Sequence, residues 1–83
     1  MFEIVLFPKA AKFYNKLDDK TAKRIDKGIE ELKSNPLSGN NIKKLSGNLA
    51  GKYRLRIGDI RIVYFVEGQT VVIEAIGYRG NIY

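Results

Sequence analysis

The spacing of apolar side chains at the start of the chain predicts a strand followed by a helix. Phe2, Ile4 and Leu6 recur at every second position, so residues 2–7 are expected to form a strand. Pro8 then stands where the first turn of a helix tolerates proline. Apolar residues follow at the i, i+3, i+4 and i+7 positions of a short amphipathic helix, namely Ala10, Phe13, Tyr14 and Leu17.

A second apolar stripe predicts a longer helix. Asp18-Asp19 supplies an N-cap, and Ser34-Asn35-Pro36 ends the helix. The stripe itself consists of Ala22, Ile25, Ile29 and Leu32. Gly28 weakens the interior of this helix, so we expect it to serve close packing against a neighbouring element. Residues 36–42 are polar and predict a loop.

The segment from Tyr53 to Tyr64 predicts a tight β-hairpin with a defined register. Gly58-Asp59 fits a two-residue type II′ loop, because glycine takes its first central position. This loop pairs Ile57 with Ile60, Arg56 with Arg61, Leu55 with Ile62, Arg54 with Val63 and Tyr53 with Tyr64. Side chains alternate between the two faces of a strand. One face of the hairpin is therefore apolar, and the other carries Arg54, Arg56 and Arg61.

The remaining strand completes the predicted fold. Strands are expected near residues 52–57, 60–66 and 70–76, the last two joined by a turn at Glu67-Gly68-Gln69. Strict alternation along the third strand separates Val71, Ile73 and Ala75 from Val72, Glu74 and Ile76. The same parity assigns Glu74 and Tyr78 to the face that carries the arginines.

The order β-α-α-β-β-β predicts a single α+β domain spanning residues 1–83. Both helices are expected on the apolar face of a twisted, mainly antiparallel sheet, with the first strand added at one edge. The other face would then be a concave, partly open and basic surface.

The composition favours some kinds of function and excludes others. The net charge is +6, of which residues 43–83 contribute +4 from seven basic and three acidic residues. A clustered basic face is typical of nucleic-acid binding. Cysteine and histidine are absent, which excludes disulfides, thiolate zinc sites, cysteine nucleophiles and histidine acid–base catalysis. No apolar run approaches the roughly 20 residues of a membrane span, and we expect a cytoplasmic protein without metal or cofactor.

The arginine pair at the hairpin is the main functional signal. Like charges directly opposite each other destabilise a sheet, so Arg56 and Arg61 favour a polyanion-binding surface over a structural role. A structural alternative pairs Arg61 with Glu74 on the same face. The lysines of the two helices, together with Arg24, have two interpretations. They form a solvated outer face, or they make auxiliary phosphate contacts.

Three segments of the second half resemble the RelE branch of the RelE/ParE toxin superfamily. They are Lys43-Lys44-Leu45-Ser46-Gly47, the pattern Tyr53-Arg54-Leu55-Arg56 through Arg61-Ile62-Val63-Tyr64, and Ile76-Gly77-Tyr78-Arg79-Gly80-Asn81-Ile82-Tyr83. The resemblance implies a ribosome-dependent mRNA endonuclease that cuts in the decoding site. The RNA's own 2′-hydroxyl is the nucleophile, and a 2′,3′-cyclic phosphate is the product.

The resemblance also implies roles for individual residues. The two catalytic arginines of the family match Arg61 and Arg79, and its C-terminal catalytic tyrosine matches Tyr83. Arginine suits bidentate contact with phosphate but is a poor general base, so Tyr83 is the candidate for proton transfer. The expected RNA-binding residues are Lys43, Lys44, Arg54, Arg56 and Tyr78. Relatives usually carry lysines where Arg54 and Arg56 stand, so any role of a neutral lysine as base is not copied here.

The resemblance implies two partners: a cognate RelB-like antitoxin protein, and the ribosome with its mRNA. Two other functions remain open. The first is a ParE-like toxin that inhibits DNA gyrase by binding it, and the second is a non-catalytic RNA-binding domain on the same scaffold. Arg61, Arg79 and Tyr83 favour the endonuclease, because the gyrase-binding branch generally lacks the full set.

Overall fold

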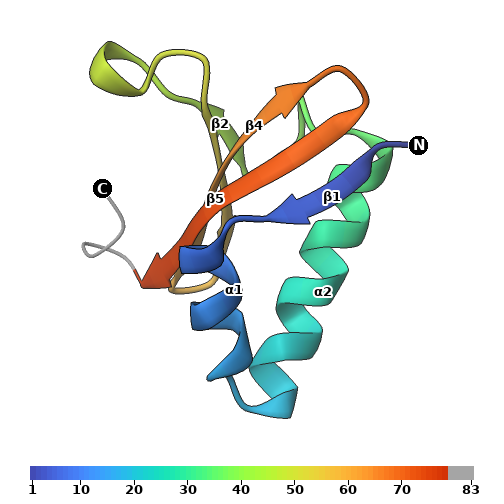
Figure 1. Cartoon of the computed structure of the whole chain (residues 1–83), viewed down its shortest axis with the longest axis vertical. Helices are drawn as coiled ribbons and strands as arrows, with labels where there is room; N and C mark the ends of the chain where they lie inside the picture. The colour runs from blue at the N-terminus through green and yellow to red at the C-terminus, as the bar shows by residue number, and fades with distance from the viewer. Residues whose placement is uncertain (79–83) are drawn as a thin grey trace.

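A five-stranded sheet with two helices on one side forms the framework (Figure 1). The computed structural model describes residues 1–78. The strands are β1 (Glu3–Leu6), β2 (Ile42–Lys44), β3 (Tyr53–Ile57), β4 (Ile60–Glu67) and β5 (Thr70–Tyr78). Their order is β1-β5-β4-β3-β2, with β1 parallel to β5 and the other neighbours antiparallel. The predicted α+β architecture, with the first strand at one edge, is confirmed.

The helices begin and end close to the predicted residues. Helix α1 (Pro8–Asn15) starts with its proline in the first turn, and Phe7 before it is extended. Helix α2 (Asp19–Ser34) follows Asp18 as its N-cap residue and ends before Pro36. A single 3₁₀ turn, η1 (Gly47–Leu49), interrupts the connection between β2 and β3. Neither described helix is both long and apolar enough to cross a membrane.

The core lies between the helices and the near face of the sheet. Ala10, Ile25 and Leu32 of the two predicted helical stripes are completely buried. They pack in one cluster with buried sheet residues, which are Leu55, Ile60, Ile62, Tyr64, Val71, Ile73 and Ile76. The hydroxyl of Tyr64 donates a hydrogen bond to the buried carbonyl oxygen of Pro36 at 2.6 Å. This bond ties the segment after α2 to the central strand.

Strand β2 is absent from the sequence prediction. The sequence predicts a loop over residues 36–42, but Ile42–Lys44 pairs antiparallel with β3, and Arg56 donates its backbone N–H to the carbonyl oxygen of Asn41. Three residues with one apolar member are too few for a periodic pattern. The pairing instead depends on the free edge that β3 presents, which is a property of the assembled sheet.

A β-bulge between β4 and β5 corrects the predicted faces of β5. The register shifts between Val63 and Tyr64, so that Ile62 pairs with Ile76, Val63 with Ala75 and Tyr64 with Ile73. Glu74 has no partner in this ladder. The predicted sides of Ala75 and Ile76 are therefore wrong: Ile76 joins the core beneath the helices, and Ala75 lies on the other face. Alternation fails here because a bulge inserts one extra residue into one strand.

Candidate functional site

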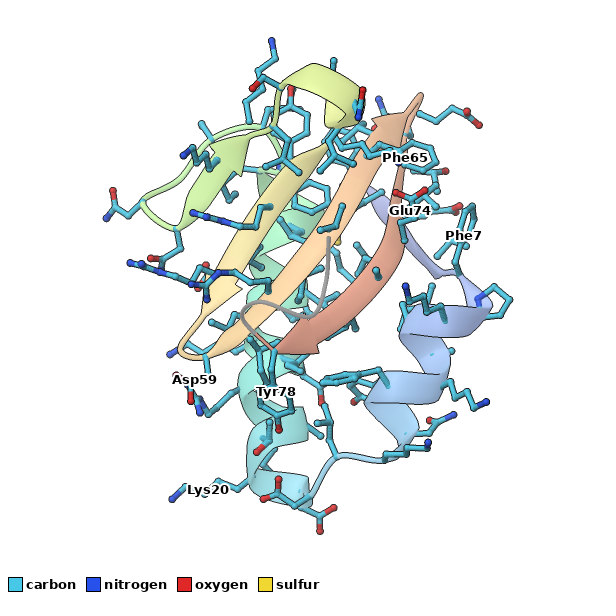
Figure 2. All side chains as sticks on the ribbon, turned by 90° about the vertical axis from the view of Figure 1, so that its left-hand side faces the viewer. Phe7, Lys20, Asp59, Phe65, Glu74 and Tyr78 are labelled. Carbon is cyan, nitrogen blue, oxygen red and sulfur yellow. The ribbon has the colours of Figure 1, made fainter. Side chains whose placement is uncertain are left out.

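The β3–β4 hairpin has the predicted turn and register. Gly58 has a φ of +57°, which a type II′ loop requires at its first central residue, whereas Asp59 has a negative φ. Arg56 and Arg61 lie directly opposite each other, as expected. The hairpin thus places two arginines next to each other on the sheet face that points away from the helices. Figure 2 looks onto this face, with α2 behind the sheet.

Strand β2 extends the basic surface by one residue. Lys43 lies opposite Arg54, so their side chains share a face, whereas Lys44 lies opposite Tyr53. The Tyr53 ring stacks on Tyr64 at a centroid distance of 5.7 Å, on the side of the helices. Four predicted residues therefore come together in what we call the cationic face, which comprises Lys43, Arg54, Arg56 and Arg61. Lys44 belongs to the opposite side of the sheet.

The alternative ion pair between Arg61 and Glu74 does not form. Glu74 Oε1 instead forms an ion pair with Lys52 Nζ at 2.8 Å. Arg61 Nη1 donates to the carbonyl oxygen of Gly58 at 3.0 Å and more weakly to that of Ile60 at 3.5 Å. Between Met1 and Tyr78 the ion pairs are Lys33–Glu30 and Lys52–Glu74, and neither contains an arginine. The charge of the cationic face is therefore not neutralised by a carboxylate of the described chain.

Arg54 carries a buried donor without an acceptor. Its Nε atom is shielded from solvent and has no hydrogen-bond partner among residues 1–78. Buried polar atoms are nearly always hydrogen-bonded, because an unsatisfied donor costs about 1–3 kcal/mol. Arg54 Nε is therefore an unpaired donor of the sheet, and no acceptor among residues 1–78 offsets its cost.

Tyr78 lies on the other side from the predicted one. It pairs with Ile60, and its ring contacts Phe13 of α1 edge-on at a centroid distance of 5.6 Å. The bulge turns it toward the helices, so the expectation that it shares the arginine face is wrong. Arg79 and Tyr83 lie outside the described residues, and their roles stay predictions.

Tyr64 and Tyr14 are not candidates for proton transfer. Burial, with a smaller contribution from Tyr53, raises the pKa of Tyr64 well above the ordinary tyrosine value. A hydrogen bond to Asp26, at 2.5 Å, is the main cause that raises the pKa of Tyr14. Both hydroxyls therefore remain protonated near neutral pH, and both lie on the helix side of the sheet.

A groove of about 650 Å³ opens beside the cationic face, between α2 and the hairpin. Its charged lining comprises Arg24, Lys27, Arg56, Arg61, Glu31 and Asp59. Gly28 lies at the closest approach of the two elements, since a Cβ atom there would stand 2.5 Å from Ile57 Cδ1. The predicted close packing of Gly28 is confirmed. A glycine inside α2 is also the sequence signal that could have placed neighbouring Arg24 and Lys27 beside the hairpin, because it marks where the helix packs closely.

The repulsion between Arg56 and Arg61 is measurable. Arg56→Gln should raise the free energy of unfolding by about 0.2–1 kcal/mol in urea denaturation, because the like-charge pair disappears. The gain should shrink as salt screens the charges. Lys44→Gln is the matched control, because Lys44 lies opposite an uncharged residue, and it should leave stability nearly unchanged. Equal effects of both variants would contradict the pairing argument.

The sequence and the fold of this chain are similar to those of known toxins. A family model described as the ParE toxin of the type II toxin–antitoxin system parDE matches residues 4–83. No curated protein matches the chain at a significant level.

Solved structures are similar over nearly the whole chain. The YoeB/ParE toxin from Agrobacterium tumefaciens is 24% identical with a TM-score of 0.84, and the match covers 94% of this chain and 99% of that one. YoeB in the heterotetrameric YoeB-YefM toxin-antitoxin complex from Staphylococcus aureus is 29% identical with a TM-score of 0.80, covering 95% and 98%. The isolated E. coli RelE toxin is 22% identical with a TM-score of 0.80, covering 94% and 84%. At 24% and 22% identity, the first and third of these matches support the fold alone.

Proposed function

The chain belongs to the ParE toxin family of type II toxin–antitoxin systems, and we propose from this premise that it inhibits translation as a ribosome-dependent mRNA endonuclease. The observation that carries the proposal is the cationic face. Lys43, Arg54, Arg56 and Arg61 converge there without a neutralising carboxylate among residues 1–78. Such a surface suits the phosphodiester backbone of single-stranded RNA.

The reaction proposed is attack by a ribose 2′-oxygen on the adjacent phosphorus. The bond from phosphorus to the 5′-oxygen breaks, which leaves a 2′,3′-cyclic phosphate and a 5′-hydroxyl. Negative charge grows on the phosphate oxygens during this step, and the forked guanidinium of Arg61 can bind two of them. Arg79 is proposed to assist Arg61, while Lys43, Arg54 and Arg56 hold the strand, with Lys44 as a contact at the sheet edge.

Proton transfer must remove the 2′-hydroxyl proton and supply one to the 5′-oxygen. Arginine does not deprotonate in proteins, and the whole chain has neither histidine nor cysteine. We assign the transfer to Tyr83, whose phenolate a neighbouring guanidinium would favour. A protein so equipped should cleave free RNA poorly, because it has no histidine to act as acid or base near neutral pH. Dependence on the ribosome, which would orient the mRNA, follows from this shortage.

Cleavage mapping on programmed ribosomes tests the proposal. Purified toxin, added to ribosomes that hold a defined mRNA, should cut the message in the decoding site and leave a 2′,3′-cyclic phosphate at the new 3′ end. The same mRNA without ribosomes is the control and should stay largely intact. Intact mRNA on the ribosome, with toxin shown to be folded, would refute the endonuclease.

Inhibition of DNA gyrase is the second candidate, and the matching family model, which describes a ParE toxin, favours it. In that case the cationic face would contact an acidic protein surface, and no phosphodiester would break. A supercoiling assay separates the two functions. Loss of gyrase activity without mRNA cleavage would select this candidate, whereas cleavage without gyrase inhibition would exclude it.

An antitoxin partner is proposed for either activity, since the similar YoeB from Staphylococcus aureus is described in a complex with YefM. We expect a RelB-like protein with an acidic segment that covers Arg56 and Arg61, because carboxylates would relieve their repulsion. A complex in which both guanidinium groups stay open to solvent would contradict this mode of inhibition.

A further inference from the structure

Two arginines from different layers of the fold meet at one turn. Arg61 of β4 donates to the Gly58 carbonyl oxygen, and the Arg24 guanidinium of α2 lies directly against the position that a Gly58 side chain would occupy. Glycine at the turn thus leaves room for Arg24 to reach the hairpin. The helix and the sheet thereby contribute charge to the same small region.

The groove beside this turn is continuous with the cationic face. Arg56 and Arg61 belong to the cationic face and also line the groove, whose opposite wall carries Arg24 and Lys27 of α2. Its volume of about 650 Å³ lies within the range of about 300–1,000 Å³ that holds small ligands. Half-buried Ile57 contributes apolar surface, against which a ribose or base can pack.

The charge of the groove selects an anion. Four cationic side chains face two carboxylates, Glu31 and Asp59, and none of the four forms an ion pair within residues 1–78. Glu31 also lines a separate groove of about 400 Å³ on the side of Asn35 and Ser38, and so marks the far end of the cationic lining. An extended occupant with repeated negative charge can touch both the sheet face and α2.

We propose that this groove is a second RNA subsite, in which Arg24 and Lys27 bind backbone phosphates of the strand held on the cationic face. The mRNA passes over the Gly58-Asp59 turn and around the edge of β3, beyond the end of β2. This inference rests on the proposed function, because it extends the path of the same substrate. RNA is favoured over an acidic peptide because three of the four cationic groups are arginines, whose planar forks bind phosphate oxygens in pairs.

Binding of a non-cleavable RNA tests the subsite. The probe is a short single-stranded oligoribonucleotide with 2′-O-methyl groups, titrated by fluorescence anisotropy against the full chain over a range of salt concentrations. The test protein carries Arg24→Gln and Lys27→Gln. The matched control carries Lys20→Gln and Lys23→Gln, which remove the same charge from the same helix outside the groove.

The groove variant should bind about tenfold more weakly at low salt. The slope of log affinity against log salt should fall in magnitude by about 1.4, since each lost contact with single-stranded RNA contributes about 0.7. The control variant should retain the wild-type slope. Identical slopes for the two variants, or no binding by the wild type at low salt, would overturn the subsite. A groove variant that loses antitoxin affinity with an unchanged RNA slope would also overturn it and assign the groove to an acidic peptide.

Failure of the subsite and failure of the endonuclease give different results. If the wild type leaves mRNA intact on ribosomes while the groove variant shows the reduced salt slope, the endonuclease fails and the subsite stands. If the wild type cleaves and both double variants bind RNA alike, the subsite fails and the endonuclease stands.

Discussion

Arg61→Ala is expected to lower the rate of mRNA cleavage on programmed ribosomes by about 10²–10³-fold. Arg61 is half-buried and held by its bond to the Gly58 carbonyl oxygen, so its guanidinium is positioned before substrate arrives. A preorganised donor costs no rearrangement when charge develops on the phosphate. Removal of that donor should therefore raise the barrier of the chemical step. Single-turnover cleavage at saturating toxin measures this step directly.

Two further variants separate catalysis from charge. Arg61→Lys keeps the charge but loses the planar fork, so it should recover only part of the activity. Lys23→Ala removes a charge from the exposed surface of α2 and should cleave at the wild-type rate. Arg61→Ala should also unfold no more easily than the wild type, because it removes a like-charge neighbour of Arg56. Normal cleavage by the folded Arg61→Ala protein would eliminate Arg61 as the phosphate stabiliser.

Tyr64→Ala should lower the free energy of unfolding by about 3–5 kcal/mol. The side chain is completely buried at the centre of the sheet, stacks on Tyr53 and bonds to the Pro36 carbonyl oxygen. Truncation leaves a cavity and an unsatisfied carbonyl group. A loss of this size is a large part of the roughly 5–15 kcal/mol that stabilises a typical protein. Urea denaturation monitored by circular dichroism gives the value.

Tyr64→Phe isolates the hydrogen bond. The ring and its stacking remain, so the expected loss is about 1–3 kcal/mol, the cost of leaving the buried Pro36 carbonyl oxygen unpaired. If both substitutions cost the same, packing of the ring contributes nothing and the cavity argument fails.

The wild type and Tyr64→Phe should differ in how their stability falls in alkaline solution. Burial raises the pKa of Tyr64 in the folded chain above its unfolded value of 10.0, so the folded state holds this proton more tightly. The resulting stability is fully present below pH 10 and is lost as the pH rises above it. Tyr64→Phe lacks this group and should show a shallower loss of stability in that range. Parallel pH profiles would contradict the assignment.

The register of the β3–β4 hairpin can be predicted from neighbouring residues alone. Gly58-Asp59 determines a two-residue loop, the loop determines the register, and alternation then places Arg56 opposite Arg61. Each step involves neighbouring residues only. The face of Arg54, Arg56 and Arg61 could therefore be predicted without any knowledge of the packing. The helix boundaries at Pro8 and Pro36 are local in the same way.

Other parts of the site depend on segments that are distant in the sequence. Lys43 joins the cationic face only because β2 pairs with β3, and Tyr78 leaves it because the bulge shifts the register of β5. Arg24 and Lys27 come to the hairpin only because α2 packs against β3 at Gly28. Residue spacing does not encode these relations.

By itself, the sequence determined the order of the main elements, the hairpin and its three arginines, because turn chemistry and side-chain alternation act between adjacent residues. The tertiary structure decided which further charges surround those arginines. Strand pairing, the bulge and the docking of α2 brought in Lys43, Arg24 and Lys27 and turned Tyr78 toward the helices. These outcomes depend on which edges and faces become available only once the chain has folded.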